Sequence, residues 1–270
     1  MQVGFLTACM RKRSLEECVA FAGQAGFDAL EVHMGHLPAE RAASEASKIK
    51  DLFAEHGVAL SGIAAYGDML AGDREAHVAM LKQYVDGCVA LGTDVLCALA
   101  GKPVEGKSKE QTLAEDVKEV FTPVAQYAAD HGVKLAFENW FATNIQHFGQ
   151  WDALLEALPF DNVGFNYDPS HLLWQGIDYL GGVDRYAARI FHTHAKDTEV
   201  REDLLAHLGK QSGTWWRYVI PGFGSIDWGR FVARLRRAGF DGVLSIEHED
   251  STFSPEEGLE KGLAYLRLFA

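Results

Sequence analysis

Basic residues are scarce in this sequence. It has 25 Lys and Arg residues against 38 Asp and Glu residues, which gives a formal net charge of −13. Such a chain repels nucleic-acid phosphates unless a local basic patch overrides its field. The compact basic runs, at 11–13 and 234–237, are interpreted as a loop and as the solvated side of a helix. No nucleic-acid partner is therefore expected.

Paired cysteines and long apolar runs are missing as well. Cys9, Cys18, Cys88 and Cys97 form no Cys-x-x-Cys pair and lie in or beside apolar segments. Free thiols of this kind fit a reducing cytoplasm. No apolar run approaches the length of a membrane span, and the start of the sequence does not resemble a signal peptide. We expect a cytoplasmic protein without a membrane partner.

The sequence does contain a repeated alternation of short β-rich runs and helical segments. Helical periodicity is clearest at 14–25, 73–91 and 113–129, and Ser14 with Glu17 predicts a capping box. Glycines that suit the left-handed end of a helix follow the helical segments at Gly26, Gly57, Gly92, Gly132 and Gly239. The β-rich runs lie at about 2–7, 28–33, 58–65, 93–100, 133–138, 162–167, 189–194 and 242–247.

This alternation predicts an α/β fold, a single closed (β/α)8 barrel that forms one domain over residues 1–270. An open doubly wound sheet is the alternative. That fold would be expected to have a glycine-rich phosphate turn after an early strand, and Met10-Arg11-Lys12 stands there instead. The longest stretch without predicted structure, 196–226, would lie over the C-terminal face, where the active sites of barrels are found.

Four neighbouring predicted strands end on residues that can bind a metal ion. These residues are Glu138, Asp168, His194 and Glu247. Because side chains alternate along a strand, an inward Glu138 would share the barrel axis with Ala136 and send Phe137 toward the helices. The same alternation directs Phe165, Tyr167, Phe191, Thr193, Leu244 and Ile246 outward.

Three carboxylates and one imidazole suit a divalent ion of hard or borderline character. We expect one bound ion, with Mn²⁺ favoured and Mg²⁺, Co²⁺ or Zn²⁺ as alternatives. Without a cation, three acids crowded at one barrel mouth would repel one another and take up protons. The strand ends therefore predict a metal centre at the mouth of the barrel.

Several motifs carry a resemblance to a known family. They are Phe137-Glu138-Asn139, Asp168-Pro169-Ser170-His171, His194-Ala195-Lys196-Asp197, Pro221-Gly222-Phe223-Gly224-Ser225-Ile226-Asp227-Trp228 and Ile246-Glu247-His248. They resemble the xylose isomerase-like TIM-barrel superfamily over nearly the whole chain. That group includes sugar phosphate isomerases/epimerases, ketose 3-epimerases, inosose dehydratases and the endonuclease IV type (AP endonuclease family 2).

The resemblance implies a metal-dependent sugar isomerase or epimerase of carbohydrate metabolism. Glu138 and Glu247 would bind the metal and also exchange a proton on opposite faces of the carbon beside a carbonyl, through a metal-stabilised enediolate. His171 and Arg217 would bind the substrate, and Trp140 and Tyr66 would form an apolar wall for a sugar face. The binding partner would be a small carbohydrate. A homo-oligomer is a further possibility, because barrels of this group often form dimers.

Other functions compete with this interpretation. A lyase or dehydratase acting on a keto-inositol or a 3-keto-glycoside would share the first proton abstraction, and Trp215-Trp216 hints at a substrate larger than a pentose. An endonuclease of this group would bind several zinc ions through many histidines. The early strands offer only His33 and His36, and the third and fourth strands end without a metal ligand. A non-catalytic sugar-binding or partner subunit would predict a degenerate metal site.

Overall fold

A computed structural model describes residues 1–270, and eight parallel strands in it close into one barrel. Around the barrel the strands follow the order β1, β10, β7, β6, β5, β4, β3, β2. Their bounds are β1 Gln2–Leu6, β2 Ala29–His33, β3 Ala59–Ala65, β4 Val95–Ala98, β5 Lys134–Glu138, β6 Val163–Tyr167, β7 Ile190–Ala195 and β10 Val243–Ile246. The predicted (β/α)8 barrel is confirmed, and the doubly wound alternative is excluded because the sheet has no open edge.

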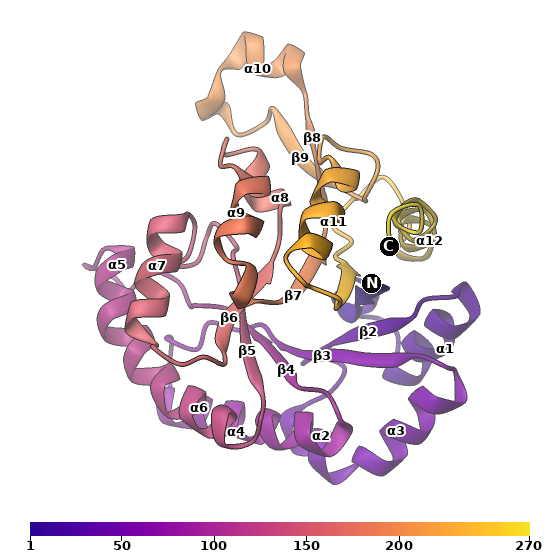
Figure 1. The fold of residues 1–270 in the computed structure, drawn as a ribbon, viewed down its shortest axis with the longest axis vertical. Coiled ribbons are helices and arrows are strands. Elements are labelled where there is room, and N and C mark those ends of the chain that lie inside the picture. The colour runs from indigo at the N-terminus through magenta and orange to yellow at the C-terminus, as the bar shows by residue number, and fades with distance from the viewer.

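Helices surround the barrel and connect its strands (Figure 1). They are α1 Leu15–Ala25, α2 Ala39–Ser44, α3 Ala46–Glu55, α4 Arg74–Leu91, α5 Lys109–Thr112, α6 Lys118–Asp130, α7 Phe148–Ala157, α8 Ser170–Leu173, α9 Tyr179–Arg185, α11 Trp228–Arg237 and α12 Pro255–Leu266. None of the helices is both long and apolar enough to cross a membrane.

Local signals in the sequence fix where the helices begin and end. Ser14 and Glu17 form the predicted capping box at the start of α1, where each side chain accepts from the other residue's backbone N–H. The helix ends at Gly26 with φ +85°, a left-handed conformation that glycine adopts without strain. Gly92 ends α4 in the same way, with φ +83°. The predicted helical segment at 113–129 begins as a π-helical turn, Leu113–Val117, before α6.

Two apolar layers hold the barrel together. A large core lies between the outward side chains of the strands and the helices around them. A small cluster fills the barrel interior, where short side chains such as Ala136 lie among Leu6, Ala64, Val95 and Cys97. The interior is therefore packed, so that the space for a ligand lies above it, at the carboxyl ends of the strands.

One predicted orientation is wrong. Phe191 packs against the cluster inside the barrel instead of facing the helices. The pairing of β6 with β7 shifts register between Phe165 and Asn166, so that Phe165 pairs with Ile190 and Asn166 with His192. An irregularity of this kind inserts a residue and breaks the simple alternation of side chains. Alternation is restored at His192, and His194 points inward as predicted.

The segment at 196–226, which the sequence predicts to be without regular structure, forms two strands and a helix. It contains the antiparallel strands β8 Asp197–Val200 and β9 Trp216–Val219, joined through α10 Glu202–Leu208. Figure 1 shows this hairpin and α10 as an arm that projects beyond the barrel. Asp197 anchors its base by accepting from the backbone N–H of Ile226 and from Trp228 Nε1. The sequence does not reveal these two strands, because each is too short for a clear alternation of polar and apolar residues and a helix separates them.

Candidate metal centre

The four predicted ligands meet at one point. Glu138 ends β5, Asp168 follows β6, His194 lies near the end of β7, and Glu247 follows β10. One ligand atom from each residue lies within 4.8 Å of those of the other three. The barrel produces this meeting because the carboxyl ends of its parallel strands converge on a single mouth.

Two buried atoms of this cluster lack any hydrogen-bond partner. They are His194 Nδ1 and Asp168 Oδ2. His194 Nδ1 lies 3.2 Å from Glu247 Oε2 and 3.6 Å from Glu138 Oε1. Polar atoms buried without a partner are rare because they lose their hydration and gain nothing in return. An imidazole nitrogen and carboxylate oxygens directed at one point fit a divalent cation.

A fifth residue, Glu31 on β2, orients the histidine ligand. Its Oε2 lies 3.0 Å from His194 Nε2 and accepts a hydrogen bond from Ser245 Oγ at 2.8 Å. Its Oε1 accepts from Tyr66 Oη at 2.8 Å. With Nε2–H donating to Glu31, the lone pair of Nδ1 is free to bind a metal ion. Sequence reasoning did not assign this role, although an inward carboxylate in an apolar strand was a usable signal.

The charges in this network are strongly coupled. Burial by itself would raise the pKa of Glu31, but His194 and His192, with hydrogen bonds from His194 and Tyr66, lower it to about 2. Burial opposes a charged imidazole, yet Glu31 and Glu247 raise the pKa of His194 well above its usual value. A metal ion bound at Nδ1 would therefore compete with a proton on His194.

Lys196 is a second residue of the site that sequence reasoning missed. Its side chain is fully buried, and Nζ lies 2.6 Å from Glu247 Oε2 and 3.4 Å from Asp168 Oδ2. Glu249 Oε2 lies 3.1 Å away on the solvent side, and the Tyr218 ring lies below Nζ at 4.5 Å. Burial would lower the pKa of Lys196, but Glu247 and Asp168 raise it well above its usual value. A fixed ammonium thus lies beside the ligand carboxylates.

A cavity of about 440 Å³ opens over the cluster. His171 lies on its wall, with Nε2 3.2 Å from Glu138 Oε1 and Nδ1 2.6 Å from the hydroxyl of Tyr218. Trp140 and Tyr66 also line the cavity, which brings them together with His171 as anticipated. Tyr66 differs from the expected apolar wall in one respect, since its hydroxyl is bonded to Glu31.

Arg217 does not reach this cavity. Its neighbours Trp216 and Tyr218 line the wall, so alternation along β9 turns Arg217 to the other face of the hairpin. There Nη1 lies 2.9 Å from Asp250 Oδ1, and Nε donates to Glu199. The substrate-binding role expected for Arg217 is corrected accordingly, because its guanidinium is already paired with two carboxylates. The cations that line the cavity are Arg11 and Lys196.

A second cluster of possible ligands lies deeper in the barrel. Glu31, Cys97 and His192 are close enough to share an ion. Both carboxylate oxygens of Glu31 already accept hydrogen bonds, while His192 pairs with Asn166 Oδ1 at 3.1 Å and Ser61 Oγ at 3.3 Å. Because the carboxylate of Glu31 and both ring nitrogens of His192 already have hydrogen-bond partners, we interpret this group as structural support beneath the candidate metal centre.

Comparisons with known proteins identify the family of this chain. The family described as Xylose isomerase-like TIM barrel matches residues 19–269. An inosose dehydratase of Geobacillus thermodenitrificans (strain NG80-2) is 25% identical over 94% of this chain and 89% of its own.

Solved structures share the fold. A probable 3-DHS dehydratase, AsbF, from Bacillus anthracis has a TM-score of 0.80 at 18% identity, covering 99% of both chains. The IolI protein, solved with a bound zinc atom, has a TM-score of 0.76 at 22% identity, covering 100% of this chain and 99% of its own. A D-psicose 3-epimerase scores 0.76 at 17% identity, with the same coverage. The chain belongs to the xylose isomerase-like TIM-barrel family.

Proposed function

We propose that this protein is a divalent-metal-dependent enzyme that moves a proton at the carbon beside a carbonyl group, and so isomerises or epimerises a sugar or a sugar-like substrate. The observation that carries the proposal is the pair of carboxylates, Glu138 and Glu247, that face the unpartnered His194 Nδ1 at 3.6 and 3.2 Å. Glu138, Asp168, His194 and Glu247 would hold the ion. A bound divalent ion supplies a Lewis acid for the substrate carbonyl.

Each of the two carboxylates has its own neighbour for proton transfer. Glu138 lies beside His171, and Glu247 lies beside Lys196. Burial would raise the pKa of Glu247, but Lys196 and His194 lower it well below its usual value, so this carboxylate stays ionised. Because β6 and β7 separate β5 from β10, the two carboxylates approach a substrate from different sides. One can remove a proton and the other can return it.

The wall of the cavity suits a polyhydroxylated substrate. Trp216 stacks on Trp174 with ring centroids 4.2 Å apart, and Phe141 lies edge-on to both rings. Flat aromatic surfaces of this kind pack against the C–H face of a sugar ring, while His171 and Lys196 can donate hydrogen bonds to its hydroxyl groups. Trp140 would extend the same wall.

A dehydratase is the second candidate. The buried Lys196 ammonium lies beside Glu247 and Asp168, where it could supply the proton that a departing hydroxyl group needs to leave as water. The base would remove the proton beside the carbonyl, the double bond would form toward the neighbouring carbon, and the C–O bond there would break. The inosose dehydratase among the relatives supports this candidate.

Metal analysis of the purified protein is the first test. We expect about one equivalent of Mn, Mg, Co or Zn, and its loss in the Glu138→Ala, His194→Ala double variant. Ketoses, keto-inositols and 3-keto-glycosides would then be screened in deuterium oxide with that metal. A product of unchanged composition that carries deuterium supports isomerisation or epimerisation, whereas loss of water supports the dehydratase. If neither protein binds metal after incubation with each ion, the proposal fails.

A further inference from the structure

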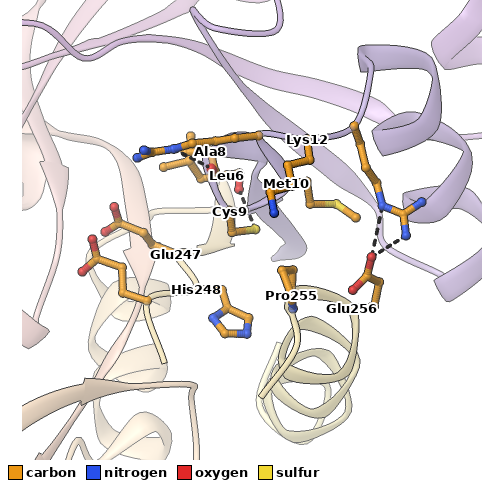
Figure 2. Close-up of a pocket in the computed structure, with 12 residues that line it drawn as sticks. Leu6, Ala8, Cys9, Met10, Lys12, Glu247, His248, Pro255 and Glu256 are labelled. Atoms are coloured by element: carbon orange, nitrogen blue, oxygen red, sulfur yellow. Dashed lines mark hydrogen bonds and ion pairs between the residues drawn. The ribbon is translucent and has the colours of Figure 1, made fainter. Parts of the chain in front are cut away.

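A second cavity, called here the outer lobe, adjoins the cavity over the metal centre, which is the inner lobe. This outer lobe has a volume of about 580 Å³ and lies between the loop that follows β1 and the loop that follows β10. Figure 2 shows its two sides, with Met10 and Lys12 opposite His248 and Pro255. The inner and outer lobes have five lining residues in common: Leu6, Ala8, Arg11, Glu247 and Glu249. A ligand held at the metal centre could therefore extend directly into the outer lobe.

Each acidic residue of the outer lobe has an ion-pair partner. Glu256 pairs with Arg13, and both Glu247 and Glu249 pair with Lys196. His248 is held by backbone contacts, with Nε2 3.1 Å from the Ser254 carbonyl oxygen.

The two remaining cations, Arg11 and Lys12, have no such partner. Neither forms an ion pair, and the Nε of Arg11 donates only to the carbonyl oxygen of Ala8 at 3.2 Å. Both nitrogens at the end of its guanidinium are free, and Arg11 borders both lobes. Arg217, close by on β9, shows the contrast, since two carboxylates occupy its guanidinium.

We propose that the outer lobe is a subsite for an anionic group, a carboxylate or a phosphate, on the substrate whose polyhydroxylated part binds at the metal centre. This inference rests on the proposed function and narrows its substrate class. A guanidinium offers two parallel N–H donors that match two oxygens of a carboxylate or phosphate. In a chain of net charge −13, two free cations at the site would also draw an anionic substrate to this mouth of the barrel.

The test compares three cyclohexane polyols, of which one is uncharged and two carry different anionic groups. They are myo-inositol without an anion, quinate with a carboxylate and inositol monophosphate with a phosphate. Calorimetry on the metal-loaded protein measures their dissociation constants for the wild type, for Arg11→Gln and for Arg236→Gln. Arg236→Gln is the matched control. Arg236 is exposed on α11 and pairs with no carboxylate, and its substitution removes the same single positive charge.

We expect the wild type to bind quinate or inositol monophosphate at least about tenfold more tightly than inositol, and the better of the two identifies the anion. Arg11→Gln should lose most of this preference and keep its affinity for inositol, while Arg236→Gln should behave as the wild type. A preference that persists in Arg11→Gln, or inositol binding as tight as that of the anionic polyols, overturns the subsite and leaves the proposed function intact. If metal-loaded wild-type protein binds none of the three, the subsite is overturned, whereas the proposed function is decided by the metal analysis described above.

Discussion

The role of Glu31 gives a quantitative prediction about metal binding. Glu31→Gln keeps the size of the side chain but removes the negative charge that fixes the Nε2–H of His194. It also removes one of the two oxygens that accept hydrogen bonds from Tyr66 and Ser245. Removal of a carboxylate behind a histidine ligand typically weakens metal binding about 10- to 100-fold. We therefore expect a loss of about 1.4 to 2.8 kcal/mol in binding free energy.

Competition with a coloured chelator would measure this loss in the folded protein, independently of turnover. Glu249→Gln is the control, because it removes a carboxylate from the same site that contacts Lys196 and not His194. Nitrogen chemical shifts of His194 in the metal-loaded protein would report which ring nitrogen carries the proton. An unchanged metal affinity in Glu31→Gln, or an equal loss in Glu249→Gln, would refute the claim that Glu31 orients the ligand.

Other perturbations test the rest of the site. Glu247→Gln should preserve the fold and lower kcat by about 100-fold or more, because a base and a ligand charge are lost together; near-normal turnover in a steady-state assay would contradict the proposed chemistry. Because neighbouring carboxylates raise the pKa of His194, metal binding should release a proton and tighten as the pH rises, which calorimetry in buffers of different ionisation enthalpy would detect. Arg217→Ala should leave KM unchanged, since its guanidinium faces away from the cavity; a raised KM would return it to the site. Gly224→Ala should lower the thermal midpoint and cost about 1–3 kcal/mol, because a Cβ there would lie 2.3 Å from Asp197 Oδ1; an unchanged midpoint would show that the hairpin base can adjust.

Much of the fold followed from local signals. Helical periodicity, the capping box at Ser14 and the glycines with positive φ are properties of a few adjacent residues, so the sequence alone indicated where several of the helices start or end. The alternation of strands and helices then indicated a parallel sheet, because a helix between two strands returns the chain to the end of the sheet where the first strand began.

The meeting of the four candidate metal ligands was also accessible to sequence reasoning. Glu138, Asp168, His194 and Glu247 come from strands that are neighbours in the barrel, and a parallel barrel brings the carboxyl ends of its strands to one face. Knowing the fold class was therefore enough to predict that these four side chains meet.

Only the tertiary structure decided which other side chains join them. Glu31 and His194 are far apart in the sequence and meet because the barrel closes, with Ser245 and Tyr66 reaching the same carboxylate from other strands. Lys196 could not be assigned from sequence because its position depends on how the chain turns after β7. These contacts join distant strands, and no local pattern encodes the distance between them.

Register and connection geometry decided the remaining differences. One shift between β6 and β7 turned Phe191 into the barrel, and the unpredicted hairpin turned Trp216 toward the cavity and Arg217 away from it. Since successive side chains of a strand point in opposite directions, a displacement by one residue reverses the face that each presents. The sequence determined which residue types are available at the mouth of the barrel, and the packing of the loops above it decided which of them face the metal centre.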